Sequence, residues 1–293
     1  MGRCRDAMDR QVGQRAEDMS RRREVEQHLL ALGDIRSIMN SMKTLAYMET
    51  RKLTRFLEAQ REVVGQMQAV ADDFLGHYPD LLSTTVPQVP QICVLFGSER
   101  GFCGDFNESL ENALKEPGVG MVHQLVVVGR KLGSRLEQDP RLAAIIDGAS
   151  VAEEVEEVLL QLIRTLTTLQ TQNGPFPLIA LYHTPDAQES LLKPLLPPFQ
   201  QRLHAPRPLP YPPLLNLSPE AFFSGLVEQY LFATLHEIAY VSLMAENQRR
   251  LRHLDGAVRH LDEQSAVLAR RSNSLRQEEI IEEIEVILLG SVN

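Results

Sequence analysis

Residues 251–275 read LRHLDGAVRHLDEQSAVLARRSNSL, and this stretch decides the fold. One row of positions in it recurs at intervals of three and four residues: Leu251, Leu254, Val258, Leu261, Ser265, Leu268, Ser272 and Leu275. Such spacing places a row of side chains along one helix face, as in the seam of a coiled coil. We therefore expect a helix that packs against another helix along this row.

The seam belongs to a much longer helical stretch that begins at residue 218. Ser218-Pro219-Glu220 combines an N-cap residue, a proline suited to the first turn and an acid near the positive helix end. No proline follows before the C-terminus. Because an α-helix rises about 1.5 Å per residue, some 70 residues would extend for roughly 100 Å. A helix of that length needs a partner helix, a partner protein or both.

A second long helix is expected over residues 21–77, which contain no proline. Their apolar residues recur at helical spacing: Val25, Leu29, Leu32, Ile35, Ile38, Met42, Leu45, Met48, Leu53, Phe56, Val63, Met67, Val70 and Phe74. We predict that the two long helices pair in antiparallel fashion, with the intervening chain folded at one end. Residues 1–20 are rich in arginine and acids without an apolar core, and we expect a disordered or frayed extension there.

Between the helices, over residues 88–215, short apolar runs alternate with helical stretches. The runs lie at residues 91–96, 123–129 and 177–183, and the helices are expected at 107–115, 130–137 and 151–172. This alternation indicates a small, mainly parallel sheet with helices on both faces. Residues 194–213 are dense in proline and should be irregular, with room for one short strand. The expected fold class is α/β: a Rossmann-like domain plus a coiled coil whose C-terminal helix covers residues 218–290.

Composition narrows the range of functions. The chain has 293 residues, of which 43% are hydrophobic, a formal net charge of −9 and a pI near 5.5. The acidic balance disfavours nucleic-acid binding. The three cysteines show no CxxC pattern, so neither a disulfide framework nor a zinc site is indicated. No apolar run reaches the ~18–20 residues that span a bilayer, so we expect any link to a membrane to run through a partner.

A glycine-rich turn follows the first apolar run: Gly97-Ser98-Glu99-Arg100-Gly101-Phe102-Cys103-Gly104. A tight turn between a strand and a helix can bind phosphate through its backbone amides. However, the spacing matches neither GxxxxGK[ST] nor GxGxxG, and no acid stands about 20 residues further on to hold a ribose. A structural strand-to-helix turn is the favoured interpretation. A dinucleotide-dependent oxidoreductase built on this turn is the alternative.

Reactive side chains do not assemble into a recognisable catalytic or metal-binding motif. No histidine shares a motif with Cys103, which we interpret as a structural thiol. His253 and His260 lie seven residues apart on the long helix, and such a pair alone predicts solvated side chains rather than a metal site. Near the C-terminus, acids alternate with isoleucines that are out of phase with the seam: Ile280, Ile281, Ile284 and Ile287. That face is suited to contact something other than the coiled-coil partner.

Three motifs, in order along the chain, resemble those of the γ subunits of F-type ATP synthases. Residues 38–46 (IMNSMKTLA) look like that family's I-T-x-A-M-K-x-V-A helix. Residues 98–107 (SERGFCGDFN) are similar to its S-D-R-G-L-C-G-x-F-N turn. Residues 273–290 (NSLRQEEIIEEIEVILLG) resemble its C-terminal N-x-x-R-Q-x-x-I-T-x-E-I-x-E-I-x-x-G signature, and Ala245-Glu246 with Arg250-Leu251 is similar to a further S-E-x-x-x-R-M run. The resemblance covers the chain from about residue 24 onward.

The chain departs from the family pattern at three places. Ile281 stands where the family has threonine, Val286 where it has a later glutamate, and His260-Leu261 where it has Asn-Ala. The departures indicate a divergent γ subunit, and an alternative F-type ATPase is one source that fits. They change the contacts expected at the helix tip, not the expected architecture.

The resemblance implies a central rotor shaft that couples translocation of protons or sodium ions to ATP synthesis or hydrolysis. The terminal helices would pair inside a ring of α and β subunits, and the α/β domain would contact the ε subunit and the membrane c-ring. Chemistry would belong to the β subunits, so this chain would be non-catalytic, without cofactor, metal or nucleic acid. Matched positions imply contacts to β subunits by Met42, Lys43, Arg276, Gln277 and Glu283.

Other interpretations stay open for some of these features. Met42 fits an ordinary coiled-coil core as well as it fits a contact to β. A general coiled-coil scaffold that dimerises through the seam is an alternative function, although a second long helix in the same chain favours an intramolecular pair. We therefore expect the isolated chain to be a monomer. The resemblance further implies one copy per complex, at the cytoplasmic face of a bacterial inner membrane. We expect polar outer helix faces with a weak grip on the surrounding ring.

Overall fold

The computed structural model describes residues 2–82, 90–116, 122–185, 190–200 and 211–290. The chain divides into two compact units. The helix-pair unit contains residues 1–44 and 254–293, and the sheet unit contains residues 45–253. Two long helices contribute to both units, because α1 spans Gly2–His77 and α5 spans Pro219–Gly290.

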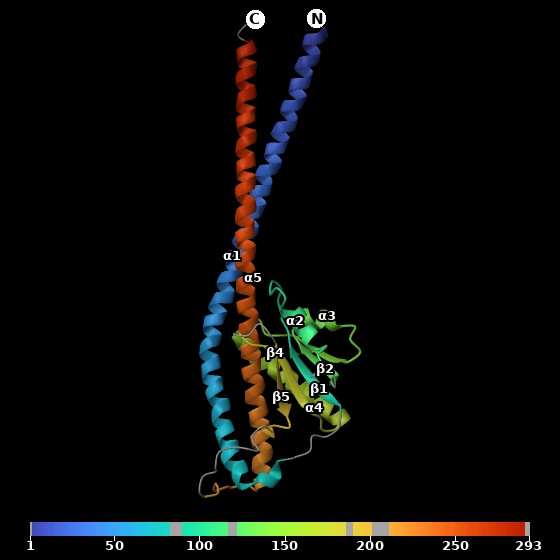
Figure 1. Cartoon of the computed structure of the whole chain (residues 1–293), viewed down its shortest axis with the longest axis vertical. Helices are drawn as coiled ribbons and strands as arrows, with labels where there is room; N and C mark the ends of the chain where they lie inside the picture. The colour runs from blue at the N-terminus through green and yellow to red at the C-terminus, as the bar shows by residue number, and fades with distance from the viewer. Residues whose placement is uncertain (1, 83–89, 117–121, 186–189, 201–210, 291–293) are drawn as a thin grey trace. The chain divides into compact units, whose positions relative to one another are not determined.

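In the helix-pair unit, residues 22–43 of α1 run along residues 255–279 of α5, and the blue and red helices of Figure 1 separate toward the chain ends. Ion pairs join the two helices: Arg22 with Glu279 (2.6 Å), Arg36 with Asp262 (2.5 Å) and Lys43 with Asp255. Residue numbers rise along α1 while those of the partners fall along α5. The predicted antiparallel pairing is therefore confirmed for this unit.

The seam row of α5 is the buried face of the pair. Leu254 is fully buried and Val258 and Leu261 are buried, while Ser265, Leu268, Ser272 and Leu275 are half-buried. The row that α1 contributes consists of buried Leu32 and half-buried Val25, Leu29, Met39 and Met42. A fully buried side chain such as Leu254 stabilises the pair by about 1.5–3 kcal/mol, and a half-buried side chain contributes less.

The helix α1 begins at Gly2 and so includes the segment for which the sequence predicts a disordered or frayed extension. No proline, the strongest helix breaker, interrupts residues 2–77. Half of the predicted apolar stripe of α1 is exposed, namely Ile35, Ile38, Leu45, Met48, Phe56, Val63 and Val70. In the helix-pair unit the buried row follows Leu29, Leu32 and Met39 instead of Ile35 and Ile38.

The sheet unit is built on a five-stranded sheet with the order β3-β2-β1-β4-β5. Its strands are β1 (Gln91–Phe96), β2 (Val122–Val128), β3 (Leu142–Ile146), β4 (Leu178–His183) and β5 (Ser190–Leu196). The first four are parallel, and β5 pairs antiparallel with β4. The three predicted strands are β1, β2 and β4, so the mainly parallel sheet is confirmed. The edge strands β3 and β5 lie outside the predicted runs.

Helices cover the sheet on both faces, as predicted. They are α2 (Phe106–Ala113), α3 (Arg130–Leu136) and α4 (Val155–Asn173), with short 3-10 turns η1 (Pro79–Leu81) and η3 (Ala152–Glu154). Successive strand residues point to opposite faces of a sheet. Accordingly Cys93 and Leu95 pack in one cluster with Phe106 and Leu110 of α2.

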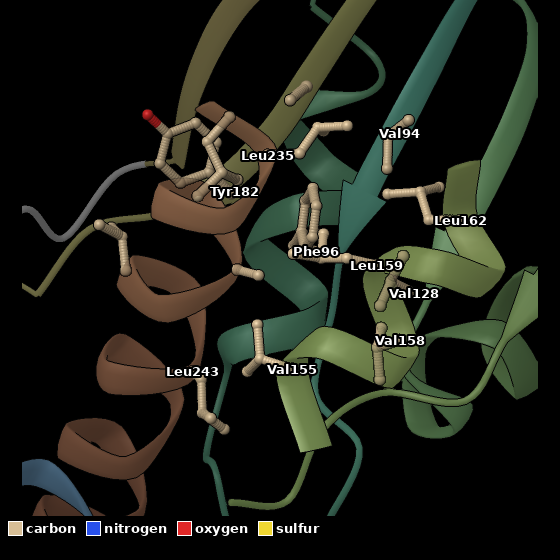
Figure 2. Close-up of a cluster of buried hydrophobic side chains, with 14 of the residues drawn as sticks. Val94, Phe96, Val128, Val155, Val158, Leu159, Leu162, Tyr182, Leu235 and Leu243 are labelled. Atoms are coloured by element: carbon tan, nitrogen blue, oxygen red, sulfur yellow. The ribbon is translucent and has the colours of Figure 1, made fainter. Parts of the chain in front are cut away.

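The opposite face forms a larger apolar core between the sheet, α4 and the parts of α1 and α5 in this unit. Strand residues Val94, Phe96, Val128 and Tyr182 meet α4 and α5 there, as Figure 2 shows. The α4 side chains are Val155, Val158, Leu159 and Leu162, and those of α5 include Leu235 and Leu243. This packing fixes α5 across the sheet, directly beside the loop that follows β1.

Candidate functional site

The glycine turn, residues 97–104, follows β1 at the carboxyl edge of the parallel strands. Gly97 N donates to Val128 O (2.8 Å), which holds the turn beside the end of β2. Ser98 N donates to Asn107 Oδ1 (3.0 Å), and Asn107 Nδ2 donates to Ser98 Oγ (2.8 Å). The two ends of the SERGFCGDFN motif thus bind each other and fix the turn to the start of α2.

Glu99, within the turn, joins three loops through one buried carboxylate. Its Oε2 accepts hydrogen bonds from Arg130 N (2.9 Å), after β2, and from Gly148 N (2.8 Å), after β3. Its Oε1 pairs with the Arg130 guanidinium. The loops at the carboxyl ends of β1, β2 and β3 therefore form one hydrogen-bonded assembly.

Glu246 of α5 approaches the same turn from the other side. Its carboxylate lies 3.3 Å from Glu99 N and 3.5 Å from Arg100 N, and it pairs with Arg250 one turn later on α5. Both members of the pair are buried, with 3% of Glu246 and 6% of Arg250 exposed. Burial raises the pKa of Glu246, while Arg250 and the two backbone amides act in the opposite direction.

This geometry argues against nucleotide binding at the turn. Strand order reverses at β1, and in open α/β sheets ligands bind outside the strand ends at that point. Here the amides of residues 99 and 100 are directed at the Glu246 carboxylate. The cavity among the ends of β1 and β2, α4 and α5, which reaches the turn at Gly97, measures about 30 Å³, whereas ligand pockets usually measure about 300–1,000 Å³.

Cys103 lies in the turn as a buried thiol rather than as an activated nucleophile. Its Sγ contacts Arg250 Nη2 (3.3 Å) and Glu246 Oε1 (3.8 Å), and burial, followed by the Glu246 charge, raises its pKa to about 12. Because the thiolate is the reactive form, we expect iodoacetamide at pH 8 to leave Cys103 unmodified in the folded chain and to alkylate it in urea. Peptide mass spectrometry measures both states. Rapid alkylation of the folded chain would contradict the buried, protonated thiol.

The remaining candidates for chemistry do not come together. His253 and His260 are exposed; the His253 ring lies 6.5 Å from that of Phe102, and His260 bonds Gln264 (3.0 Å). Among the described residues, no group of three or more potential metal ligands occurs. A cavity of about 510 Å³ in the sheet unit has no titratable side chain in its lining. None of the described helices is long and apolar enough to cross a membrane.

The predicted β-contact residues all lie on the helix-pair unit. Met42 is half-buried on the α1 face that meets α5, and Lys43 forms an ion pair with Asp255 across the two helices. Arg276, Gln277 and Glu283 are exposed on α5. Leu275 occupies the half-buried seam position, so Arg276 and Gln277 project away from the pair.

The outer surface of the helix pair is not uniformly polar, which corrects the expectation of polar outer faces. Large apolar side chains are exposed on both helices: Leu30, Ile35, Ile38, Val267, Ile280, Ile281, Ile284, Ile287 and Leu288. Leu30 is 71% exposed and Ile287 69%. Two helices have only one mutual seam, so apolar residues on other faces remain in water unless a further partner covers them. Ile280, Ile284 and Ile287 recur at helical spacing near the end of α5, so they share one exposed face. A contiguous exposed apolar face of this kind marks a protein–protein interaction site.

Three residues of the turn assembly were not predicted as site residues: Glu99, Glu246 and Arg250. The i,i+4 spacing of Glu246 and Arg250 is visible in the sequence, but it is typical of any solvated helix face. Their burial together is evident only once α5 packs against the turn.

Comparisons with known proteins agree with the architecture. The chain matches the family described as ATP synthase over residues 21–292. It is 22% identical to the ATP synthase gamma chain of Caldanaerobacter subterraneus subsp. tengcongensis, across 92% of this chain and 99% of that protein.

Solved structures show the same fold. The chain is similar to one in the rotor of the Euglena gracilis mitochondrial ATP synthase (TM-score 0.57, 14% identity, 89% of this chain and 99% of that chain). A second similar chain lies in the OSCP/F1/c-ring structure of the same enzyme (TM-score 0.60, 14% identity, 93% and 94%). The family match covers nearly the whole chain, and the helix pair, the mainly parallel sheet and the order of the motifs agree with it. This chain therefore belongs to the ATP synthase gamma-chain family.

Proposed function

We propose that this chain is the central rotor shaft of an F-type ATP synthase or ATPase. It couples translocation of protons or sodium ions to ATP synthesis or hydrolysis on β subunits. The helix pair stands inside a ring of α and β subunits, and the sheet unit contacts the ε subunit and the membrane c-ring. The chain is a peripheral subunit at the cytoplasmic face of a bacterial inner membrane, with one copy per complex.

The observation that supports this proposal best is the exposed apolar surface on the helix pair. A coiled coil that worked alone would bury its large apolar residues in its seam and keep its other faces polar. Here Ile280, Ile281 and Ile284 are exposed near the C-terminal end of α5, beyond Leu275, the last residue of the seam row. A surrounding protein ring would remove these side chains from water.

In this role the chain performs no bond chemistry. Rotation of an asymmetric shaft presents a different face to each β subunit in turn, so that each β site is held in a different state. Met42, Lys43, Arg276, Gln277 and Glu283 are the residues we assign to β contacts. Their positions on the helix-pair unit, with Arg276 and Gln277 exposed, support this assignment.

The decisive test is Arg276→Ala combined with Gln277→Ala in the assembled complex. Both side chains are exposed, so the variant chain should keep the melting temperature of the wild type. Loss of their polar contacts to β should lower the number of ions pumped per ATP hydrolysed severalfold. ATP-driven quenching of a pH-sensitive dye in vesicles measures the transport of protons, and uptake of labelled Na⁺ measures the transport of sodium ions. Either value is divided by the rate of phosphate release.

A matched control is His260→Ala with Gln264→Ala, which removes an exposed pair of side chains that bond each other on the same helix. We expect this control to keep the wild-type ratio. Full coupling in the Arg276/Gln277 variant would remove these residues from the interface. Failure of the wild-type chain to assemble with α and β subunits would overturn the proposed function itself.

A further inference from the structure

One face of α5 holds the loop after β1 over more than two helical turns. Ser242 Oγ donates to Phe96 O (3.2 Å), and Glu246 faces the amides of residues 99 and 100. Arg249 pairs with Asp105 (2.6 Å), and Arg250 Nε donates to Gly101 O (3.2 Å). The contacts run from the last residue of β1 to the residue before α2.

The centre of this contact has the chemistry of an anion site. Consecutive backbone N–H groups in a turn carry partial positive charge and bind anions. In this chain the anion is a side chain of the same molecule, the Glu246 carboxylate. Arg250 supplies the positive charge, and its Nη1 is also held by Asn247 Oδ1 (2.8 Å).

A buried ion pair of this kind is weak evidence for net stability, but removal of one member leaves the other charge buried and unpaired. Arg250 is only 6% exposed, so it has little access to water if Glu246 is lost. The pair therefore makes the position of the turn depend on a negative charge at one defined place on α5.

We infer that Glu246 is an intramolecular anionic ligand of the glycine turn, and that Glu246 and Arg250 form the joint that transmits torque between the sheet and α5. The torque role rests on the proposed function, whereas the anion-ligand role does not. α5 continues without interruption from Arg250 to Gly290. Glu246 acts as a positioning residue, since it holds the turn and takes part in no reaction.

Chemical rescue with acetate tests the anion-ligand role of Glu246. Glu246→Ala keeps Cβ and removes one methylene and the carboxylate, which together have the size and charge of acetate. The vacated space retains the two amides and Arg250. Acetate should therefore bind there, whereas an equal concentration of chloride should not restore the contacts. Propionate, larger by one methylene group, should rescue less than acetate.

The first measurement is the melting temperature of the full-length chain at constant ionic strength. Glu246→Ala should lower it by roughly 10 °C, as expected for an unpaired buried charge in a chain of this size. Acetate should recover a large part of the loss in this variant and leave the wild type unchanged. Glu246→Gln should melt lower than the wild type without rescue, because the amide fills the space that acetate needs.

A second variant separates the anion site from general packing. In Glu246→Ala combined with Arg250→Met the counter-ion is absent, and acetate should have no effect. Equal stabilisation of all variants by acetate, or no stabilisation of Glu246→Ala, overturns the anion-ligand role. If Glu246→Ala fails to fold, Glu246→Gln still tests the anion-ligand role. A wild-type melting temperature for Glu246→Gln would show that the negative charge is not needed.

The torque role needs the assembled complex. Glu246→Ala should lower ion pumping per ATP hydrolysed, and acetate should restore the ratio. Acetate could restore the melting temperature of Glu246→Ala while the substitution leaves the pumping ratio at the wild-type value. That result would support the anion site and reject the torque joint. If the wild-type chain neither assembles nor couples, the proposed function fails while the melting result stands.

Discussion

Gly129→Ala is expected to destabilise the sheet unit by about 3 kcal/mol or more, through backbone strain and steric overlap. Gly129 has φ +113°, a conformation that residues with a Cβ rarely adopt. An added Cβ would lie 2.7 Å from Gly97 O and 2.9 Å from Ser98 O. Both contacts are to backbone at the glycine turn, so no flexible side chain can move aside.

Two alanine substitutions elsewhere separate these contributions. Gly174 also has positive φ (+79°, with ψ −173°) but no atom within 4 Å of an added Cβ, so Gly174→Ala isolates the backbone strain, about 1–3 kcal/mol. Gly101→Ala meets no atom within 4 Å and should change stability little. Urea unfolding followed by circular dichroism measures all three. If Gly129→Ala is as stable as Gly174→Ala, the glycine turn does not pack against the end of β2.

Leu254→Ala is expected to destabilise the helix pair by about 2–5 kcal/mol, because it leaves a cavity in the seam. Leu254 is 0% exposed and Leu261 is 9% exposed, so Leu261→Ala should fall in the lower part of the same range. Val267→Ala is the control on the same helix, since Val267 is 55% exposed. We expect that control to stay within about 0.5 kcal/mol of the wild type.

Amide hydrogen exchange over residues 20–44 and 254–290 is a suitable measurement, because local stability can differ between parts of one chain. Faster exchange in both segments of Leu254→Ala is the expected result. Unchanged melting and exchange in both Leu254→Ala and Leu261→Ala would rule out a buried seam.

The helices could be predicted almost completely from local sequence. The three-and-four spacing from Leu254 to Leu275 places one row on one face of any α-helix, whatever its surroundings. The absence of proline after Pro219 lets the helix continue to Gly290. The strands β1, β2 and β4 were predicted because strands buried on both faces are almost wholly apolar.

The edge strands could not be predicted in the same way. β3 has alternating exposure and only five residues, and β5 includes Lys193 and Pro194. Edge strands tolerate charge and proline because one side has no neighbouring strand to bond. Their composition therefore resembles that of a loop until the sheet provides a partner.

Likewise, only the tertiary structure determines which face of α1 is buried. Ile35 and Ile38 fit a helical stripe as well as Leu32 does, yet only Leu32 is buried. Periodicity shows that a face is apolar, but the partner helix determines which of two adjacent apolar rows it covers.

The sequence by itself determined that the chain forms two long helices and a small, mainly parallel sheet, and its motifs indicated the family. These properties depend on neighbours within a few residues, where spacing alone fixes which side chains share a face. Only the tertiary structure decided that Glu246 occupies the anion position of the glycine turn, 147 residues away in the chain. A carboxylate and an amide so far apart interact only after α5 has packed on the sheet, and no local pattern records that approach.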